Sequence, residues 1–265
     1  MASAKGVALI TGGAKRLGRA FCEALAEDGY DIAVHYNSSD RDAQGLIDAL
    51  SAKGVTARAF GADFFNAEAV EALIPAVNAA MGPVSVLVNS ASIFEEDSHG
   101  DVSAKSFRRH LDANTLAPVL LSKAFAAQAP DGAMIFNLLD YKLFNINADF
   151  YSYTISKAAL HSVTQMLARA LAPRVRVNAA APGLTLPSPY HSEEAFRALH
   201  DDNPLACGPT PEDLVRTLRW FLATPSVSGQ VVCVDGGQHF DPRLTRDVFG
   251  ALKTDYLLDL QGGDP

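Results

Sequence analysis

Two residues near the middle of the chain have the types and the spacing of an acid–base pair. Tyr153 and Lys157 stand four positions apart in the stretch YTISK, so on a helix their side chains share one face. An ammonium group beside a phenol favours the phenolate and lets the hydroxyl exchange its proton near neutral pH. The pair therefore predicts a general acid at Tyr153, although this spacing by itself is common in proteins.

A glycine turn near the N-terminus could bind phosphate. In ALITGGAKRLGRA an apolar strand leads into a turn and a helix, and Gly12 and Gly18 suit a tight turn and a close helix–strand approach. The N-terminus of such a helix offers free N–H groups and a positive dipole to a pyrophosphate. The middle glycine of the usual fingerprint is missing, and Arg16 stands there. We expect a dinucleotide here; an ordinary strand–helix turn is the alternative.

The segment after the second expected strand bears on the choice of dinucleotide. It consists of His35, Tyr36, Asn37, Ser38 and Ser39. NAD enzymes usually place an acidic residue here to bind the ribose diol, and this segment has none. Hydroxyls and amides can donate to a 2′-phosphate, and Lys15 and Arg16 add positive charge nearby. NADPH is therefore predicted over NADH, unless the segment is only a polar turn before a helix.

Short apolar runs alternate with longer amphipathic ones along most of the chain. Strands are expected at about 6–11, 31–36, 55–61, 84–89, 133–138, 174–180 and 230–234, and helices at about 17–28, 40–53, 66–80, 103–128, 151–172 and 211–222. This alternation predicts an α/β fold, a single Rossmann-type doubly wound parallel sheet of about seven strands with helices on both faces. No linker divides the chain, so we expect one domain over 1–265. Within it we expect a substrate loop at about 184–205 with a short helix, and a C-terminal extension at 241–265.

Composition narrows the class of partner. The chain has 265 residues, of which 48% are hydrophobic, and its net charge of −8 argues against a nucleic-acid or anionic membrane surface. Three scattered cysteines and histidines without ligand spacing suggest neither disulfides nor a metal site, and favour a reducing compartment. The apolar run at 7–10 is too short to span a bilayer. We expect a cytoplasmic protein that acts on a small molecule, with no metal, membrane or nucleic-acid partner.

The motifs TGGAKRLG, ADF, LVNSAS, ANT, YTISK, APG and VDGG, in this order, resemble the short-chain dehydrogenase/reductase family over about residues 5–240. The resemblance implies that Asp63 contacts adenine, that Asn114 anchors a water of the proton relay and that Lys157 holds the nicotinamide ribose. The cofactor-binding residues that it and the turn analysis imply are Gly12, Lys15, Arg16, Leu17, Gly18, His35, Tyr36, Asn37, Ser38, Ser39, Asp63, Asn89, Ser90, Ala91, Ser92, Tyr153, Lys157, Pro182 and Gly183. Family tetramers often pack at the segment matching 234–237, so a homotetramer is expected. An apolar stripe in the tail, which needs cover, supports this expectation.

One departure from the family bears on the reaction: Asp140 stands where these enzymes usually have a serine. The serine donates to a carbonyl oxygen that becomes anionic as hydride arrives, and an ionised carboxylate would oppose that charge. A C=N bond differs because its nitrogen must gain a proton, which a carboxylate near Tyr153 can help to deliver. Asp140 therefore joins Asn114, Tyr153 and Lys157 as a predicted catalytic residue.

A narrower resemblance points to the substrate. TGGAKRLGRA, HYNSS, the phenylalanine of NSASIF and the aspartate of NLLDY are similar to the pteridine reductases, especially bacterial dihydromonapterin and dihydrofolate reductases. The residues that this resemblance implies for substrate binding are Arg16, Ser92, Phe94, Asp140 and Tyr153, with the ring of Phe94 stacked on the pterin. The basic residue often found after HY in that subgroup is absent here, which weakens the NADPH prediction without reversing it.

The leading hypothesis is thus an NADPH-dependent reductase of dihydropterins. A carbonyl reductase, such as a 3-oxoacyl-thioester reductase, is the enzymatic alternative, and an NADP-binding regulator without turnover is the second. Simpler interpretations exist for single residues: Asp140 as a helix cap, Phe94 as a core aromatic and Arg16 as an ion-pair partner. The acidic run at 95–97 is expected to be a solvated loop that borders the pocket.

Overall fold

The computed structural model describes residues 5–187 and 193–242 and builds them around one parallel sheet. Its strands are β1 (Val7–Ile10), β2 (Asp31–Tyr36), β3 (Ala57–Gly61), β4 (Val84–Asn89), β5 (Ala133–Leu138), β6 (Val175–Pro182) and β7 (Val231–Val234). They lie in the order β3-β2-β1-β4-β5-β6-β7, and every neighbouring pair is parallel. This sheet confirms the predicted fold class. Each of its seven strands overlaps a strand that was predicted from the apolar pattern of the sequence.

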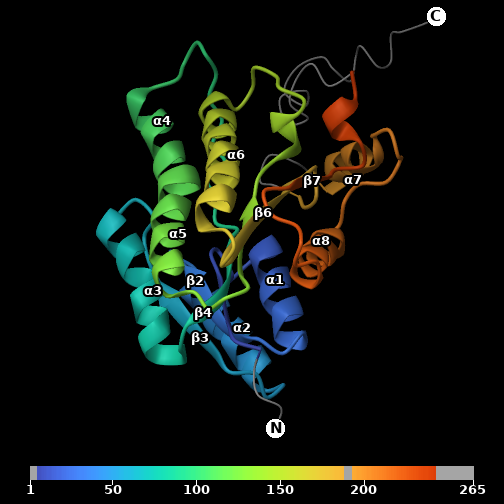
Figure 1. Cartoon of the computed structure of the whole chain (residues 1–265). Helices are drawn as coiled ribbons and strands as arrows, with labels where there is room; N and C mark the ends of the chain where they lie inside the picture. The colour runs from blue at the N-terminus through green and yellow to red at the C-terminus, as the bar shows by residue number, and fades with distance from the viewer. Residues whose placement is uncertain (1–4, 188–192, 243–265) are drawn as a thin grey trace, which may run out of the picture.

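Helices connect the strands as crossovers on both faces of the sheet (Figure 1). They are α1 (Arg16–Glu27), α2 (Asp40–Ser51), α3 (Ala67–Met81), α4 (Ala104–Leu111), α5 (Ala117–Gln128), α6 (Tyr151–Leu171), α7 (Glu193–Asp201) and α8 (Pro211–Ala223), with short 3₁₀ turns at Tyr141–Leu143 and Gln238–Phe240. The short helix expected in the loop at 184–205 is α7, whereas residues 188–192 of that loop and 243–265 of the expected extension lie outside the described residues.

Side-chain alternation along the strands divides the core into two layers. On β1, Ala8 and Ile10 face a cluster formed by α1, α2 and α8, whereas Val7 and Leu9 face a second cluster formed mainly by α3 and α5. Because both faces are covered, the central strands are apolar on both sides, as the continuous runs of the sequence indicated. The buried layers hold the carboxyl ends of the strands at one rigid edge.

The expected long helix at 103–128 contains a local widening. The structure has α4 and α5 joined by a π-helical turn at Asp112–Leu116, so the run is continuous but not regular. The side chain of Asn114, in the middle of this turn, is buried and bonds to the Ile93 backbone instead of pointing to solvent. Insertions of this kind often mark functional sites, and no periodicity in the sequence could predict it.

Among the described residues, no helix is both long and apolar enough to cross a membrane. Over the same residues, no three side chains among His, Cys, Asp and Glu gather in a way that could hold a metal ion.

The glycine turn between β1 and α1 can be tested by stability alone. A Cβ added at Gly18 would meet the Gly12 backbone, 2.7 Å from its carbonyl carbon, so Gly18→Ala should destabilise the fold by about 1–3 kcal/mol. Gly45→Ala in α2 is the matched control, because a Cβ there meets nothing within 4 Å and alanine favours a helix. Urea unfolding should separate the two; equal midpoints would contradict the close packing described here.

Candidate active site

A cavity of about 490 Å³ opens at the carboxyl edge of the sheet, where the strand order reverses between β1 and β4. Open α/β sheets bind ligands at this kind of switch point. Of the predicted residues, those that line it are Gly12, Lys15, Arg16, Leu17, Gly18, His35, Asn37, Asp63, Ser90, Ala91, Ser92, Phe94, Asp140, Tyr153, Lys157, Pro182 and Gly183. Residues from seven separate segments thus meet around one space.

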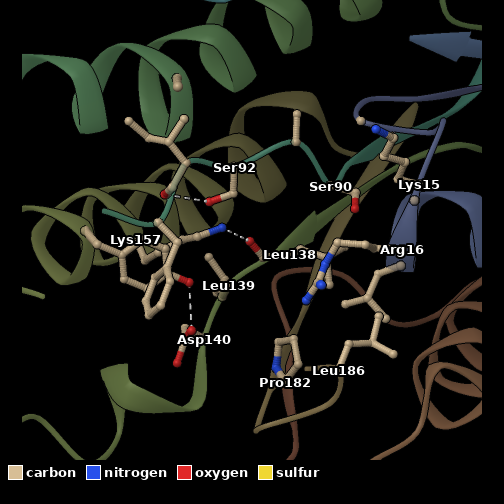
Figure 2. Close-up of a pocket in the computed structure, with 18 of the residues that line it drawn as sticks. Lys15, Arg16, Ser90, Ser92, Leu138, Leu139, Asp140, Lys157, Pro182 and Leu186 are labelled. Atoms are coloured by element: carbon tan, nitrogen blue, oxygen red, sulfur yellow. Dashed lines mark hydrogen bonds between the residues drawn. The ribbon is translucent and has the colours of Figure 1, made fainter. Parts of the chain in front are cut away.

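The centre of the site is a hydrogen bond between a phenol and a carboxylate. The Tyr153 hydroxyl donates to Asp140 Oδ2 over 2.7 Å, the bond drawn at Asp140 in Figure 2. The other carboxylate oxygen accepts from the backbone N–H of Lys142 over 2.9 Å and so caps the 3₁₀ turn that follows β5. Asp140 is therefore a helix cap and a partner of Tyr153 at once, and the cap fixes the direction of the carboxylate.

Lys157 lies on the same face of α6, one turn after Tyr153, and its side chain is buried. Its Nζ lies 5.7 Å from the centre of the Tyr153 ring and donates to the Leu138 carbonyl over 2.8 Å (Figure 2). Burial lowers the pKa of Lys157 to about 8, and the charge of Asp140 partly opposes that shift. A buried cation therefore stands beside the phenol–carboxylate pair and partly balances its charge.

Aromatic rings form one wall of the cavity. Phe94 stacks on the buried ring of Phe150, with centroids 4.1 Å apart and planes 13° from parallel, and meets the Tyr153 ring edge-on at 4.7 Å. One face of Phe94 is thus occupied by the protein. Any stacking with a ligand ring must use the opposite face, because a ring offers two faces.

Asn114 supports the site from behind the cavity wall. Its Oδ1 accepts from the Ser92 hydroxyl and the Ile93 N–H, and its Nδ2 donates to the Ile93 carbonyl and the Ser156 hydroxyl. Ser156 in turn donates to the Tyr153 carbonyl. Asn114 therefore ties the segment after β4 to the helix that carries Tyr153, and it does not line the cavity itself.

The glycine turn fits a dinucleotide phosphate. Gly12 has a left-handed φ of 62°, and a Cβ there would lie a tight 3.1 Å from the Cα of Ala91, so glycine suits this turn. Helix α1 begins directly after this turn, and it has neither a side-chain cap nor an acidic residue in its first turn. Its free N–H groups and positive dipole are therefore available to an anion.

Arg16 adopts a backbone conformation that favours glycine. Its φ is 52°, in the left-handed region, where a non-glycine residue costs of order 1–3 kcal/mol. Its guanidinium donates to the Pro187 carbonyl over 2.6 Å, which connects the turn to the loop after β6, and in Figure 2 it points towards Pro182 and Leu186. Partial burial lowers the pKa of Arg16. Strain retained at a cavity wall suggests a functional side chain.

His35 fastens the turn to the second strand. Its Nδ1 accepts from the Gly12 N–H over 3.1 Å, and its Nε2 lies 3.0 Å from the Ala62 carbonyl, so the neutral tautomer with hydrogen on Nε2 satisfies both contacts. Burial lowers the pKa of His35 to about 4, although the Ala62 bond opposes the shift. His35 thus supports the cofactor turn through the backbone of Gly12.

Five predicted residues do not line the cavity: Tyr36, Ser38, Ser39, Asn89 and Asn114. Ser39 occupies the N-cap position of α2, and Asn89 donates to Asn137 within the sheet. Lining residues that were not predicted are Phe64, Phe65, Ile93, Ala113, Leu138, Leu139 and Tyr141, whereas Leu184, Thr185 and Leu186, which also line it, lie in the expected substrate loop. Many of these follow a predicted site residue or strand end directly, so the meeting of parallel strand ends at one edge could have indicated them.

The acidic run at 95–97 corrects one expectation. Glu95 does lie at the surface, where it pairs with Arg109, but the side chain of Asp97 is only 5% exposed. Asp97 turns inward because Ser106 on α4 and Ser152 on α6 both donate to it. A charge run in the sequence gives no sign of such partners, which come from two distant helices.

Residues 6–196 match the family described as short chain dehydrogenase. The chain belongs to this family. The crystal structure of FolM alternative dihydrofolate reductase 1 from Brucella suis in complex with NADP superposes with a TM-score of 0.87, at 36% identity, covering 91% of this chain and 97% of that one.

Two curated relatives of this chain differ in the substrates that their names give. Pteridine reductase 1 of Leishmania tarentolae is 30% identical over 278 residues, covering 87% of this chain and 95% of its own length. The 3-oxoacyl-[acyl-carrier-protein] reductase FabG of Staphylococcus aureus (strain Mu50) is also 30% identical, over 241 residues, covering 88% and 97%. Overall identity therefore supports the family and leaves the substrate to the residues of the site.

The buried His35 should make stability depend on pH. Its pKa is about 4 in the folded protein and 6.5 ordinarily, so the unfolded chain binds more protons between these values and stability falls as pH decreases through this window. The loss should be on the order of 3 kcal/mol. His35→Gln should flatten this part of the profile in urea unfolding at several pH values. The exposed His99→Gln is the control, and a profile unchanged by His35→Gln would contradict the assignment.

Proposed function

We propose that this protein is an NADPH-dependent reductase of dihydropterins, acting on dihydromonapterin, dihydrobiopterin or dihydrofolate. The observation that carries the proposal is the 2.7 Å hydrogen bond between Tyr153 and Asp140 at the cavity wall. A carboxylate at this position disfavours a developing alkoxide and suits a nitrogen that gains a proton. Tetrahydropterins are the products, formed by reduction of one C=N bond.

The side chains of the site have distinct roles in this reaction. NADPH, when bound, supplies the hydride for the carbon of the C=N bond. Tyr153 and Asp140 hold a proton between two oxygens that face the cavity and present it to the ring nitrogen. Lys157 keeps a positive charge beside them, and Asp140 accepts from N–H groups of the ring. Phe94 and Arg16 line the same cavity and supply stacking and charge contact for the pterin.

For the cofactor, the site offers the glycine turn, the first turn of α1, and the segment at Asn37, which lacks an acid. The cofactor is NADP(H), in agreement with the NADP in the Brucella suis structure. The residues that would hold its phosphates and ribose are Gly12, Lys15, Arg16, Leu17, Gly18, Asn37 and Lys157.

A carbonyl reductase is the second candidate, because FabG is as similar in sequence as pteridine reductase 1. Asp140 argues against it, for it replaces the donor that a carbonyl oxygen needs. The intact pairing of Tyr153 with Asp140, next to Lys157, argues against a regulator without turnover.

We further propose a cytoplasmic homotetramer. Two features support assembly: β7 is an edge strand whose residues are all only partly buried, and Trp220 on the neighbouring α8 is 48% exposed. The apolar stripe of the tail, from Leu244 onwards, lies outside the described residues.

Cofactor preference is testable at Asn37, which lines the same cavity as Lys15. The parent should have a higher kcat/KM with NADPH than with NADH. Asn37→Asp should reduce that preference at least about tenfold, because a carboxylate repels a 2′-phosphate and accepts from a ribose diol. Ser38→Asp, one residue further from the cavity, should have a smaller effect. Equal values for both cofactors in the parent would reject the prediction.

Asp140→Ser tests the catalytic carboxylate. Serine can still cap the 3₁₀ turn, so fold and NADPH affinity should barely change, whereas dihydropterin turnover should fall at least about tenfold, or about 1.4 kcal/mol of transition-state stabilisation. The loss should appear in kcat if Asp140 acts in proton delivery and in KM if it only holds the ring. Asp140→Asn keeps the shape of the side chain and removes its charge, so it separates a role in proton delivery from a role in holding the ring. Undiminished turnover in Asp140→Ser would show the carboxylate to be incidental.

A further inference from the structure

The helix that carries Tyr153 has no cap of its own. The residue before it, Phe150, has a left-handed backbone with φ 51° and makes no capping hydrogen bond from its side chain. Free N–H groups at a buried helix start must find acceptors elsewhere. In α6 these acceptors come from a different part of the chain, the segment that follows Phe94.

Asp97 supplies the acceptors for the first two N–H groups of α6. Its backbone carbonyl accepts from the Tyr151 N–H over 3.0 Å, and its Oδ1 accepts from the Ser152 N–H over 2.8 Å. The Ser152 hydroxyl, which is fully buried, donates to Oδ2 of the same carboxylate. The first two residues of α6, immediately before Tyr153, are therefore held by the backbone carbonyl and the side chain of one residue, which lies 55 positions before Ser152 in the sequence.

A second helix holds Asp97 in turn. The Ser106 hydroxyl on α4 donates to Oδ2 over 2.6 Å, and the fully buried ring of His110, one turn further, contacts the Ser106 carbonyl and the Glu95 N–H. Burial opposes the ionised form of Asp97, but the bonds from Ser106 and Ser152 outweigh it and lower its pKa. The group is thus a carboxylate with several charge-assisted bonds, which are about twice as strong as neutral ones.

Phe94 and Asp97 both contact the start of α6 next to Tyr153. Phe94 packs on Phe150 and against the Tyr153 ring. Asp97 accepts from the backbone N–H groups of the two residues that separate Phe150 from Tyr153 in the sequence. The Tyr153 hydroxyl then reaches Asp140 over 2.7 Å. Hydrogen-bond geometry of this kind is lost with small displacements, and misplacement of about 1 Å can cost on the order of 100-fold in rate.

We propose that Asp97 is a positioning residue for Tyr153, acting through the first turn of α6 to keep the phenol within reach of Asp140. The assignment rests on the proposed role of Tyr153 as the proton donor. An ordinary helix cap would support stability alone, so the test must separate rate from stability. Asp213 offers the comparison, since it caps α8 with Thr210 on the other side of the sheet.

The experiment measures kcat, the KM of NADPH and the thermal midpoint for Asp97→Ala, Asp97→Asn and Asp213→Ala. We expect both alanine variants to lower the midpoint, but only Asp97→Ala to lower kcat, by about tenfold or more, with the KM of NADPH within about twofold of the parent. Asp97→Asn keeps an acceptor for the Ser152 N–H and should fall between the parent and Asp97→Ala. A kcat of Asp97→Ala within about twofold of the parent, at a temperature where it is folded, would overturn the assignment.

A double-variant cycle shows whether the effect passes through Tyr153. In a Tyr153→Phe background, Asp97→Ala should change the remaining rate by less than about twofold, because the group that it positions is already gone. An undiminished effect in that background would overturn the proposal. The cycle is run on whichever compound the parent reduces, dihydropterin or acetoacetyl thioester. If the parent reduces the thioester but no dihydropterin, the proposed substrate is wrong, and the cycle still tests the role of Asp97.

A crystal structure of Asp97→Ala needs no turnover at all. The distance from the Tyr153 hydroxyl to the Asp140 carboxylate should increase to more than 3.5 Å, which is too long for a hydrogen bond. A distance that stays at 2.7 Å would overturn the assignment. If Asp97→Ala does not fold, Ser106→Ala removes one donor and keeps the carboxylate. That variant should lower kcat about two- to threefold, and no change in kcat would count against the proposal in the same way.

Discussion

The hydrogen bond between the Tyr153 hydroxyl and the Asp140 carboxylate is the contact on which the proposed chemistry of this protein depends. It joins two elements with different roles, the end of β5 and the first turns of α6. The strand end is fixed because β5 lies in the middle of the sheet, with β4 and β6 on either side. The 3₁₀ cap then directs the carboxylate, so that one oxygen serves the backbone and the other serves the phenol.

The helical side of this contact needs more support, because α6 begins after an irregular loop. Its first two residues are held by Asp97, and the Ser156 hydroxyl donates to the Tyr153 carbonyl at the same end of the helix. Ser156 in turn accepts from Asn114 in the π-helical turn. These supports are polar, buried and mutually satisfied, which makes them rigid and specific. The cofactor turn is stabilised in a similar way on the other side of the cavity, where His35 accepts from Gly12.

The sequence predicted the parts of this arrangement that depend on local pattern. Strand and helix alternation gave the fold class, and the four-residue spacing placed Tyr153 and Lys157 on one face of α6. Asp140 could be assigned to the same edge because it follows a predicted strand. Long-range polar contacts could not be predicted: Asp97 was expected in solvent, and its burial requires serines from α4 and α6.

The π-helical turn escaped prediction for the same reason, since it depends on the bonds of Asn114 to the segment after β4. Ser38 and Ser39 carry the right chemistry for a phosphate but lie outside the cavity wall, where Asn37 is the residue that reaches it. Whether a polar residue lines a cavity or flanks it is decided by one or two positions along the chain. Pattern locates a strand end only to within about that distance.

We propose that the Asp140 carboxylate beside Tyr153 selects a C=N bond over a ketone. The most direct measurement compares kcat/KM of the parent protein, with NADPH, for dihydromonapterin, dihydrobiopterin, dihydrofolate and an acetoacetyl thioester. We expect at least one dihydropterin to be reduced with a kcat/KM at least about 100-fold above that of the thioester, a difference of about 2.7 kcal/mol in transition-state stabilisation. A thioester that is reduced as well as or better than every dihydropterin would contradict it.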